Sequence, residues 1–390
     1  MDETSQKTIP RPAFQSEGSF KCYGFGFNGL RQITVNAVDV YESREVDIET
    51  DGSHPSAVLA PVHLNVDCVS SIVASWSSIF YLKENGTISK VGWNSKTKMF
   101  GEEENLLPDH FVTDACCSWT QLAFLTKDGD CLQWSDYTRL NEESKPVKVH
   151  SNGTKFKAVG CRESSCIALS GNGQAGFICS EQVQDGSVAK PVPVFKAIDI
   201  NKEITSVACG KEHALLLTSS GTVYSLGSGS RGQLGRGLIV EEQSSEVVPA
   251  LEGIKMQFIA AGGWHSAAIS EFGDLYMWGW NEKGQLGLAV DLDDTLSSTG
   301  GQVQCQTVPV PVSFPDDLEV LMVSCGSRHT AAILGDGSVW TWGWGYYGQL
   351  GHGDQADRSA PTQVAAFFPL KLKPKTLYCG TWSTFLMISK

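Results

Sequence analysis

The stretch Cys325–Gly351, CGSRHTAAILGDGSVWTWGWGYYGQLG, shows the plan of the whole chain. A Cys-Gly-x-x-His anchor opens it, an apolar run follows, and a turn with Gly335 and Gly337 leads into a second apolar run. Two short apolar runs around a glycine turn predict a β-hairpin. Because one hairpin cannot bury its own apolar face, we expect it to stack against others of its kind.

The same unit recurs along the chain in a fixed register. His213, His265 and His329 each stand eight residues before a turn glycine. Weaker copies place other polar residues at this anchor position, namely Ser78, Gln121 and Ser165. A register that is kept over six copies indicates a repeat architecture.

A seventh copy is split between the two ends of the sequence. Residues 379–388 supply an anchor and one apolar run, and the missing half, YGFGFNG, stands at residues 23–29. We therefore predict an all-β, seven-bladed β-propeller over residues 20–390, closed by pairing of the N-terminal and C-terminal strands, so that no sheet edge stays open. Residues 1–19 are polar and are predicted to form a flexible tail.

Composition narrows the classes of function. The 390 residues carry a net charge of −13 with a pI near 5.1 and no run of Lys or Arg, so we expect no direct DNA binding. We expect no membrane contact either, since no apolar stretch could span a bilayer and the first residues lack the core of a signal peptide. The predicted state is a monomeric propeller in the nucleus, on chromosomes or in the cytoplasm, with its 12 cysteines as free thiols. Five of them share one repeat position, where a small apolar side chain suits a strand: Cys117, Cys161, Cys209, Cys325 and Cys379.

Two kinds of motif suggest chemistry but have simpler interpretations. The anchor histidines are either metal ligands or, as we favour, rings hydrogen-bonded inside the blades. The G-x-G-x-x-G words at 227–232 and 343–348 match a dinucleotide fingerprint, but the helix that such a site needs is not indicated. We predict no catalytic residue, cofactor or metal site. The predicted structural anchors are Gly210, His213, Gly262, His265, Gly326, His329 and Gly380.

Partner binding is expected on loops and exposed aromatic residues. Residues 238–249 and 288–311 form long connections that are either functional or disordered. Most Trp and Tyr residues are expected to pack the blades, and those that reach the rim are expected to anchor a partner. The candidate partner-binding residues are Tyr23, Phe25, Phe27, Asp291, Asp293, Asp294 and Tyr346. The three aspartates resemble a cation site in composition only, and a solvated acidic loop is favoured.

The repeat resembles that of the regulator of chromosome condensation family. The shared motif consists of G-x-x-H, an apolar strand, a glycine turn and W-x-W-G-x-x-x-x-G-Q-L-G. The resemblance covers residues 20–390 and is weak from about 60 to 190. This resemblance implies a seven-bladed propeller closed by its termini.

Words such as WGWN at 278–281 and SCGSRHTA at 324–331 are similar to one vertebrate type of member. That similarity implies a non-enzymatic scaffold that binds a JmjC-domain lysine demethylase and arginyl hydroxylase. It also implies action in histone H3 lysine methylation at centromeric repeats, spindle organisation and chromosome segregation, with histone or chromatin proteins as further partners. The alternative is the family's founding activity, guanine-nucleotide exchange on the small GTPase Ran, which would need a wedge that the sequence does not place.

Overall fold

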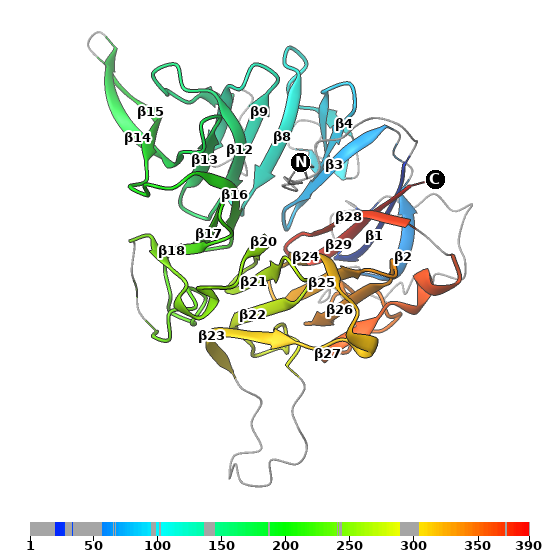
Figure 1. Ribbon diagram of the computed structural model, residues 1–390. Helices are drawn as coiled ribbons and strands as arrows, with labels where there is room; N and C mark the ends of the chain where they lie inside the picture. Colours follow the sequence, from blue (N-terminus) through cyan, green and yellow to red (C-terminus); the bar gives the residue numbers. More distant parts are fainter. Residues whose placement is uncertain are drawn as a thin grey trace, which may run out of the picture.

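The computed structural model describes residues 20–27, 33, 57–64, 66, 68–94, 99–100, 103–135, 145–185, 188–239, 241, 244–288, 304–370 and 373–389. The strands in these ranges form seven antiparallel sheets that stand as blades around a ring (Figure 1). The predicted seven-bladed β-propeller is confirmed. In the same ranges no helix has the length and apolar character needed to cross a membrane.

Six blades are each built from one continuous stretch of chain, with the first strand innermost. The first contains β3 (Val69–Ala74), β4 (Ser78–Lys83), β5 (Ile88–Asn94), β6 (Met99–Phe100) and β7 (Glu104–Asn105). The next two contain β8 (Val112–Cys117), β9 (Gln121–Thr126), β10 (Cys131–Ser135) and β11 (Val147–Lys148), then β12 (Phe156–Cys161), β13 (Cys166–Ser170), β14 (Ala175–Asp185) and β15 (Val188–Ala197).

The three following blades are the ones with histidine anchors. They contain β16 (Ile204–Cys209), β17 (His213–Thr218), β18 (Val223–Gly227) and β19 (Glu246–Val247), then β20 (Met256–Ala261), β21 (His265–Ser270), β22 (Leu275–Trp280) and β23 (Cys305–Val312). The last contains β24 (Val320–Cys325), β25 (His329–Leu334), β26 (Val339–Gly343) and β27 (Arg358–Gln363). In the described ranges, short 3-10 helices lie between strands: η2 (Pro249–Leu251), η3 (Pro315–Asp317) and η4 (Ala365–Leu370).

The seventh blade joins the two ends of the propeller. Its order is β2 (Ala57–Leu64), β1 (Phe20–Phe27), β29 (Ser383–Ser389) and β28 (Lys373–Cys379). β1 pairs with β29 from Phe20 opposite Ser389 to Gly26 opposite Ser383. The predicted closure is confirmed, and it gives the first and last strands partners on both sides.

The core is distributed between neighbouring blades. Seven clusters of buried apolar side chains occur, and each combines residues from two adjacent blades. Strands β17, β21 and β25 are buried along their whole length, because each is covered on both faces. This explains why HALLLT, HSAAIS and HTAAIL read as continuous apolar runs without alternation.

One connection differs from the sequence interpretation. The long connection at 288–311 ends earlier than expected, because Cys305–Val312 forms β23, the outermost strand of its blade. Pro309 and Pro311 disguise this strand in the sequence. They are tolerated there because an edge strand does not need every backbone N–H for pairing.

Candidate functional site

A belt of alternating aromatic and basic side chains runs around one end of the ring. Its members lie where the first strand of a blade turns into the second, or at the end of the third strand or just after it, in every blade except that of β12–β15. We call it the aromatic–cation belt; its members are Phe27, Trp76, Trp119, Lys211, Arg231, Trp264, Trp280, Arg328, Trp344, Tyr346, Tyr347 and Trp382.

Two arginines of the belt each lie between two indole rings, and each contacts at least one ring from a neighbouring blade. The guanidinium carbon of Arg231 lies 4.4 Å from the ring centroid of Trp264 and 4.7 Å from that of Trp280. The guanidinium carbon of Arg328 lies 4.7 Å from the centroid of Trp280 and 5.6 Å from that of Trp344. All four distances are within the range of attractive cation–π contact. Trp280 is therefore shared by both arginines and links three blades.

Lys211 continues the belt but also has acidic neighbours. Its ammonium nitrogen lies 4.9 Å from the ring centroid of Trp119 and 4.6 Å from that of Trp264. It forms an ion pair with Glu163 at 3.5 Å, and the indole N–H of Trp264 donates to Glu212 at 3.4 Å. Positive charge is thus balanced on this side of the belt.

The other side of the belt is aromatic. Trp344 stacks on Tyr346 with centroids 6.0 Å apart and planes at 9°, and it meets Tyr347 edge-on at 5.1 Å. Trp382 lies 5.3 Å from Tyr347 and 5.4 Å from Phe27. Tyr346 is 39% exposed, so this predicted candidate presents its ring at the surface.

Two further contacts complete the circle. The indole of Trp382 meets Trp119 edge-on with centroids 5.9 Å apart, and Trp119 lies 6.3 Å from Trp76. The belt therefore returns to Trp119 after passing through the blades of β16–β19, β20–β23 and β24–β27 and the closing blade. Aromatic and arginine side chains are the residue types that most often anchor protein partners, which makes this face the best candidate for an interaction site.

Of the other predicted partner-binding residues, Tyr23 and Phe25 lie outside the belt. Phe25 is fully buried and packs against Phe367, so its assignment to a partner surface is corrected: its alternating position in β1 points it into the core. Tyr23 is half-buried and lies 5.4 Å from His63 and 5.8 Å from Phe367. Phe27 belongs to the belt but is only 8% exposed. Asp291, Asp293 and Asp294 lie outside the described residues.

The anchor histidines connect neighbouring blades. His265 Nε2 lies 3.0 Å from the hydroxyl of Thr330, and that hydroxyl donates to the backbone oxygen of Gln285 at 2.7 Å. Because the threonine proton is used in this second bond, its oxygen accepts from an Nε2–H, which fixes the neutral tautomer of the ring. The same relay is repeated by His213 with Ser266 and Gln233, and by His329 with Thr384 and Gln349.

This relay explains the repeated Gly-Gln-Leu-Gly motif and bears on whether the anchor histidines are metal ligands or hydrogen-bonded rings. The glutamine of each Gly-Gln-Leu-Gly word offers its backbone oxygen to the next blade, and the indoles of Trp278 and Trp342 donate to the same oxygens. The three rings bond to three separate hydroxyls. The described residues contain no group of three His, Cys, Asp or Glu side chains that could hold a metal ion. The geometry supports the interpretation as hydrogen-bonded blade histidines.

Burial keeps these imidazoles uncharged. All three are completely buried, and desolvation lowers each pKa from 6.5 to about 3. A second ring proton would sit at Nδ1, which has no hydrogen-bond partner among the described groups. The anchors therefore act as neutral structural groups.

The anchor glycines leave room for these rings. A Cβ at Gly326 would lie 2.1 Å from His329 Cε1, and one at Gly262 would lie 2.4 Å from the backbone oxygen of Gly326. At Gly210 the corresponding distance to His213 Cε1 is 2.4 Å, and at Gly380 the nearest atom is Ala74 Cβ at 2.8 Å. Distances this short exclude a side chain without a shift of the backbone.

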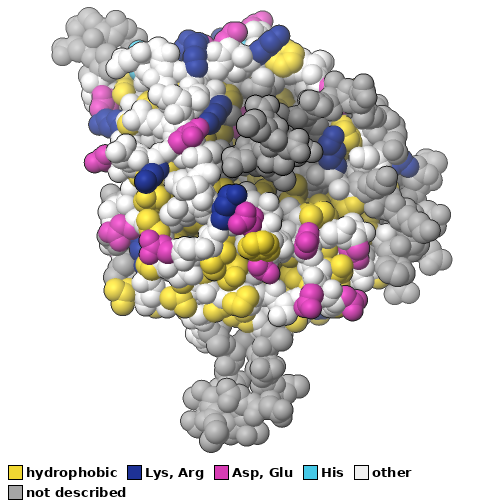
Figure 2. All heavy atoms as spheres, in the orientation of Figure 1, with side chains coloured by type: hydrophobic (Ala, Val, Ile, Leu, Met, Phe, Trp, Pro, Cys, Tyr) yellow, Lys and Arg dark blue, Asp and Glu magenta, His cyan; other side chains and the backbone are white. Residues whose placement is uncertain are grey.

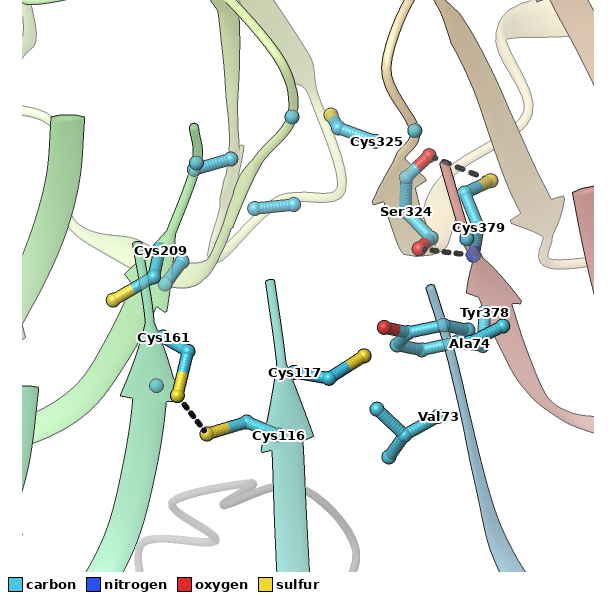
Figure 3. Close-up of a pocket in the computed structure, with 18 of the residues that line it drawn as sticks. Val73, Ala74, Cys116, Cys117, Cys161, Cys209, Ser324, Cys325, Tyr378 and Cys379 are labelled. Atoms are coloured by element: carbon cyan, nitrogen blue, oxygen red, sulfur yellow. Dashed lines mark hydrogen bonds between the residues drawn. The ribbon is translucent and has the colours of Figure 1, made fainter. Parts of the chain in front are cut away.

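A central channel of about 300 Å³ runs through the ring, lined by the innermost strands (Figure 3). Cys117, Cys161, Cys209, Cys325 and Cys379 end five of these strands. Cys161 lies with its sulfur 3.2 Å from that of Cys116 in the preceding blade, and the Cys379 thiol donates to the backbone oxygen of Ser324 at 3.3 Å. These two contacts join neighbouring blades, and all five thiols lie at the ends of strands, where the repeat position predicted a small side chain in a strand.

The channel thiols are poorly suited to nucleophilic chemistry. Burial raises the pKa of Cys117, Cys161 and Cys325 well above the usual 9.0, and raises that of Cys379 to about 12. Reactive cysteines need a stabilised thiolate, which this surrounding does not provide. All 12 cysteines are free thiols.

Charge is mixed on the face of the ring seen in Figure 2. Acidic and basic side chains are interspersed there without a continuous field of either sign. The net charge of −13 is therefore not concentrated on this side, and local groups decide which partner fits.

Comparison with known proteins agrees with this architecture. The family model described as the RCC1-like domain matches residues 138–390. The chain belongs to the RCC1-like domain family. Among curated relatives, RCC1 domain-containing protein 1 of Homo sapiens is 36% identical over 242 residues, which are 55% of this chain and 64% of that protein. The Ultraviolet-B receptor UVR8 of Arabidopsis thaliana is 38% identical over 267 residues, which are 65% of this chain and 54% of that protein.

The chain thus spans between half and two thirds of the length of these relatives. Among solved structures, Prp20p from Saccharomyces cerevisiae has a TM-score of 0.73 at 17% identity, with 96% of this chain and 92% of that chain covered. At this identity the similarity establishes the shared fold.

Sequence reasoning did not find the belt as a unit. Its members come from blades far apart in the sequence, so no local pattern joins them. A signal was nevertheless present in the residue before each anchor, which is Trp264, Arg328 or Trp382 in three of the copies. The other four copies hold Ser77, Thr120, Ser164 and Glu212 at this position, so the signal is restricted to the last three copies.

Proposed function

We propose that the chain is a non-enzymatic interaction scaffold that binds a JmjC-domain lysine demethylase and arginyl hydroxylase and acts in chromatin in the nucleus. The observation that carries this proposal is the aromatic–cation belt, a rigid set of anchor side chains at one end of a closed ring. Its half-buried indoles and arginines match the composition of interaction hot spots. Sites of this kind are grafted onto a propeller, so the fold alone does not determine the partner.

Two similarities support the choice of partner. The similarity to RCC1 domain-containing protein 1 extends over 55% of this chain, which favours the same type of partner. Prp20p, which shares the fold, is described as binding Gsp1p and histones. Histones are therefore the second class of partner that we propose.

The proposal is tested by capture of partners from nuclear extract. The purified full chain, immobilised through a tag, should enrich a JmjC-domain hydroxylase in mass spectrometry. Trp280→Ala and Tyr346→Ala should reduce this enrichment, because both remove surface from the belt. Phe272→Ala is the matched control, since Phe272 is 72% exposed in the turn between β21 and β22 at the opposite end of the blade.

A nucleotide-release assay distinguishes the alternative function. The same chain is mixed with a nucleotide-loaded Ran-type GTPase, and release of the labelled nucleotide is followed. Hydroxylase capture without accelerated release supports the scaffold. Accelerated release that is lost in the belt variants would replace it with an exchange factor, because exchange requires preferential binding of the nucleotide-free GTPase.

A further inference from the structure

The belt contains two arginines whose guanidinium groups have no acceptor among the residues that the structure describes. We infer that Arg231 and Arg328 form a receptor for an acidic peptide segment of the partner. This rests on the proposed function, because it takes the belt as the surface that meets the partner. The inference adds the chemical character of the partner segment and names the two residues that bind it.

Stacking holds both guanidinium groups in fixed planes. Trp280 contacts both arginines at 4.7 Å, and Trp264 and Trp344 contact one each from the other direction. A stacked guanidinium keeps its five N–H donors at its edge, in the plane. Pre-ordering of a flexible arginine reduces the entropy that binding would otherwise cost. The belt thus presents donors in the geometry that suits a bidentate carboxylate.

The ion pairs and hydrogen bonds of the described residues leave these donors available to a partner. Within the part of the chain that the structure describes, neither guanidinium forms an ion pair or donates a side-chain hydrogen bond. Neighbouring cations differ: Lys211 pairs with Glu163 at 3.5 Å, and Arg358 pairs with Asp354 at 2.7 Å. Arg231 and Arg328 are therefore cations without an ion-pair partner among the described residues, whereas nearby cations have one. The protein as a whole carries a net charge of −13.

The same geometry selects among occupants. The ring faces of Trp264, Trp280 and Trp344 already contact the protein's own cations, so they are not free to cage a methylated lysine. A nucleic acid would bring a long row of phosphates toward an acidic protein, whereas a short acidic peptide brings only the few charges that two arginines can pair. The exposed ring of Tyr346 beside Trp344 offers an apolar contact to a peptide side chain.

The test is a direct titration of the full chain. A short fluorescein-labelled peptide in which Glu alternates with Ser around one Phe is the probe, and fluorescence anisotropy is the readout. Two comparison ligands are the same peptide with Gln in place of Glu and a labelled single-stranded oligonucleotide. The acidic peptide should bind, should weaken as salt is raised, and should bind more tightly than either comparison ligand.

Variants locate the site. Arg231→Gln with Arg328→Gln should weaken peptide binding by about tenfold or more, because each change removes a charge-assisted hydrogen bond. Arg328→Lys keeps the positive charge but loses the planar pair of donors that binds a carboxylate. Its affinity for the peptide should lie between those of the unmodified chain and the double variant. Arg358→Gln is the matched control from the same blade and should leave binding unchanged. Melting temperatures measured in parallel show that each variant is folded.

Several outcomes would overturn the inference. They are equal binding of the Gln peptide, tighter binding of the oligonucleotide, no loss in the double variant, or self-association of the chain through the belt in place of peptide binding. This assay contains no hydroxylase, so its result is independent of the proposed function. If the variant with both arginines changed still captures the hydroxylase, and the chain does not bind the acidic peptide, then the inference of an acidic-peptide receptor is wrong. The proposed scaffold function would be retained.

Discussion

The two halves of the ring reach the same blade geometry with different connections between blades. In the half with histidine anchors, a completely buried imidazole bonds a hydroxyl of the next blade, which bonds a glutamine carbonyl. In the other half, the anchor positions bond locally: Gln121 N donates to Ser118, and Arg162 donates to Ser165, each three residues away. The contrast teaches that strand pairing and apolar packing define a blade, while the buried relay is an additional connection.

The links between blades also differ in burial. In the irregular half, one link is the surface ion pair between Asp130 in the turn after β9 and Lys155 before β12, at 2.8 Å. Another is the thiol contact of Cys116 with Cys161. Buried hydrogen bonds are expected to contribute more than exposed ion pairs, and this ordering can be tested.

The largest effect is expected from removal of the closing strand. A chain that ends before β29 (Ser383–Ser389) loses the partner of both β1 and β28, together with the buried residues Phe385–Ile388. We expect loss of the cooperative unfolding transition, because both halves of the split blade are exposed. Thermal unfolding followed by circular dichroism is the measurement. A cooperative transition at an unchanged temperature would contradict closure as a requirement.

The next largest effect is expected at an anchor glycine. Gly326→Ala places a Cβ 2.1 Å from His329 Cε1 and 2.8 Å from the backbone oxygen of Gly380, and we expect a loss of about 2–3 kcal/mol in the free energy of unfolding. Gly335→Ala is the control, since its nearest contact would be 3.7 Å. Equal losses in the two variants, from urea unfolding, would show that the anchor is not crowded.

A histidine anchor should contribute more than its counterpart in the irregular half. His265→Ala removes a fully buried ring and leaves the Thr330 hydroxyl without its donor, so we expect a loss of about 2–3 kcal/mol. Ser165→Ala, at the equivalent position, should cost about 1 kcal/mol or less. If both variants unfold at the same urea concentration, the relay is not the stronger connection.

Acidification should weaken the regular half. The folded pKa of about 3 lies below the ordinary 6.5, so folding favours the neutral ring. Its stabilisation is complete above pH 6.5 and is lost as pH falls toward 3, by about 1.4 kcal/mol per pH unit for each such histidine. Urea unfolding between neutral pH and about pH 5 measures this slope. His265→Gln should lower it by one histidine's share, and an unchanged slope would assign the pH dependence to other groups.

The smallest effect is expected at the surface link. Lys155→Gln removes an exposed ion pair with Asp130 and should change the free energy of unfolding by less than about 1 kcal/mol. High salt should have a similarly small effect on the unmodified chain. A loss as large as that of His265→Ala would reverse the proposed ordering of the two halves.

Sequence alone predicted the ring because its determinants are local. Turn glycines, apolar runs and the split copy at residues 23–29 and 379–388 specify hairpins and their closure. The role of Gln285 was not predicted, since it acts through its backbone oxygen on the next blade. Phe25 was predicted at a partner surface because the N-terminal segment was expected to carry binding, whereas β1 is an interior strand of the closing sheet and Phe25 is fully buried.

The belt required the structure for a different reason. Several of its contacts, such as those of Arg231 with Trp264 and Trp280, join residues from different blades, and a cation–π contact depends on a distance that spacing in sequence does not give. Trp344 illustrates this. Two-residue spacing predicts that it shares a face with Trp340 and Trp342, but Gly343, at φ 101, turns the chain so that Trp344 joins the belt. Trp340 and Trp342 stay together against Phe314.

The most direct test of the account is hydrogen exchange of the full chain with and without the purified JmjC-domain hydroxylase. We predict slower exchange in the segments that carry the belt, residues 261–264, 280–284 and 344–348, and no change in the turns at 271–273 and 335–337 on the opposite end of the same blades. Protection confined to those opposite turns, or an unchanged belt in a saturated complex, would contradict the assignment of the aromatic–cation belt as the partner surface.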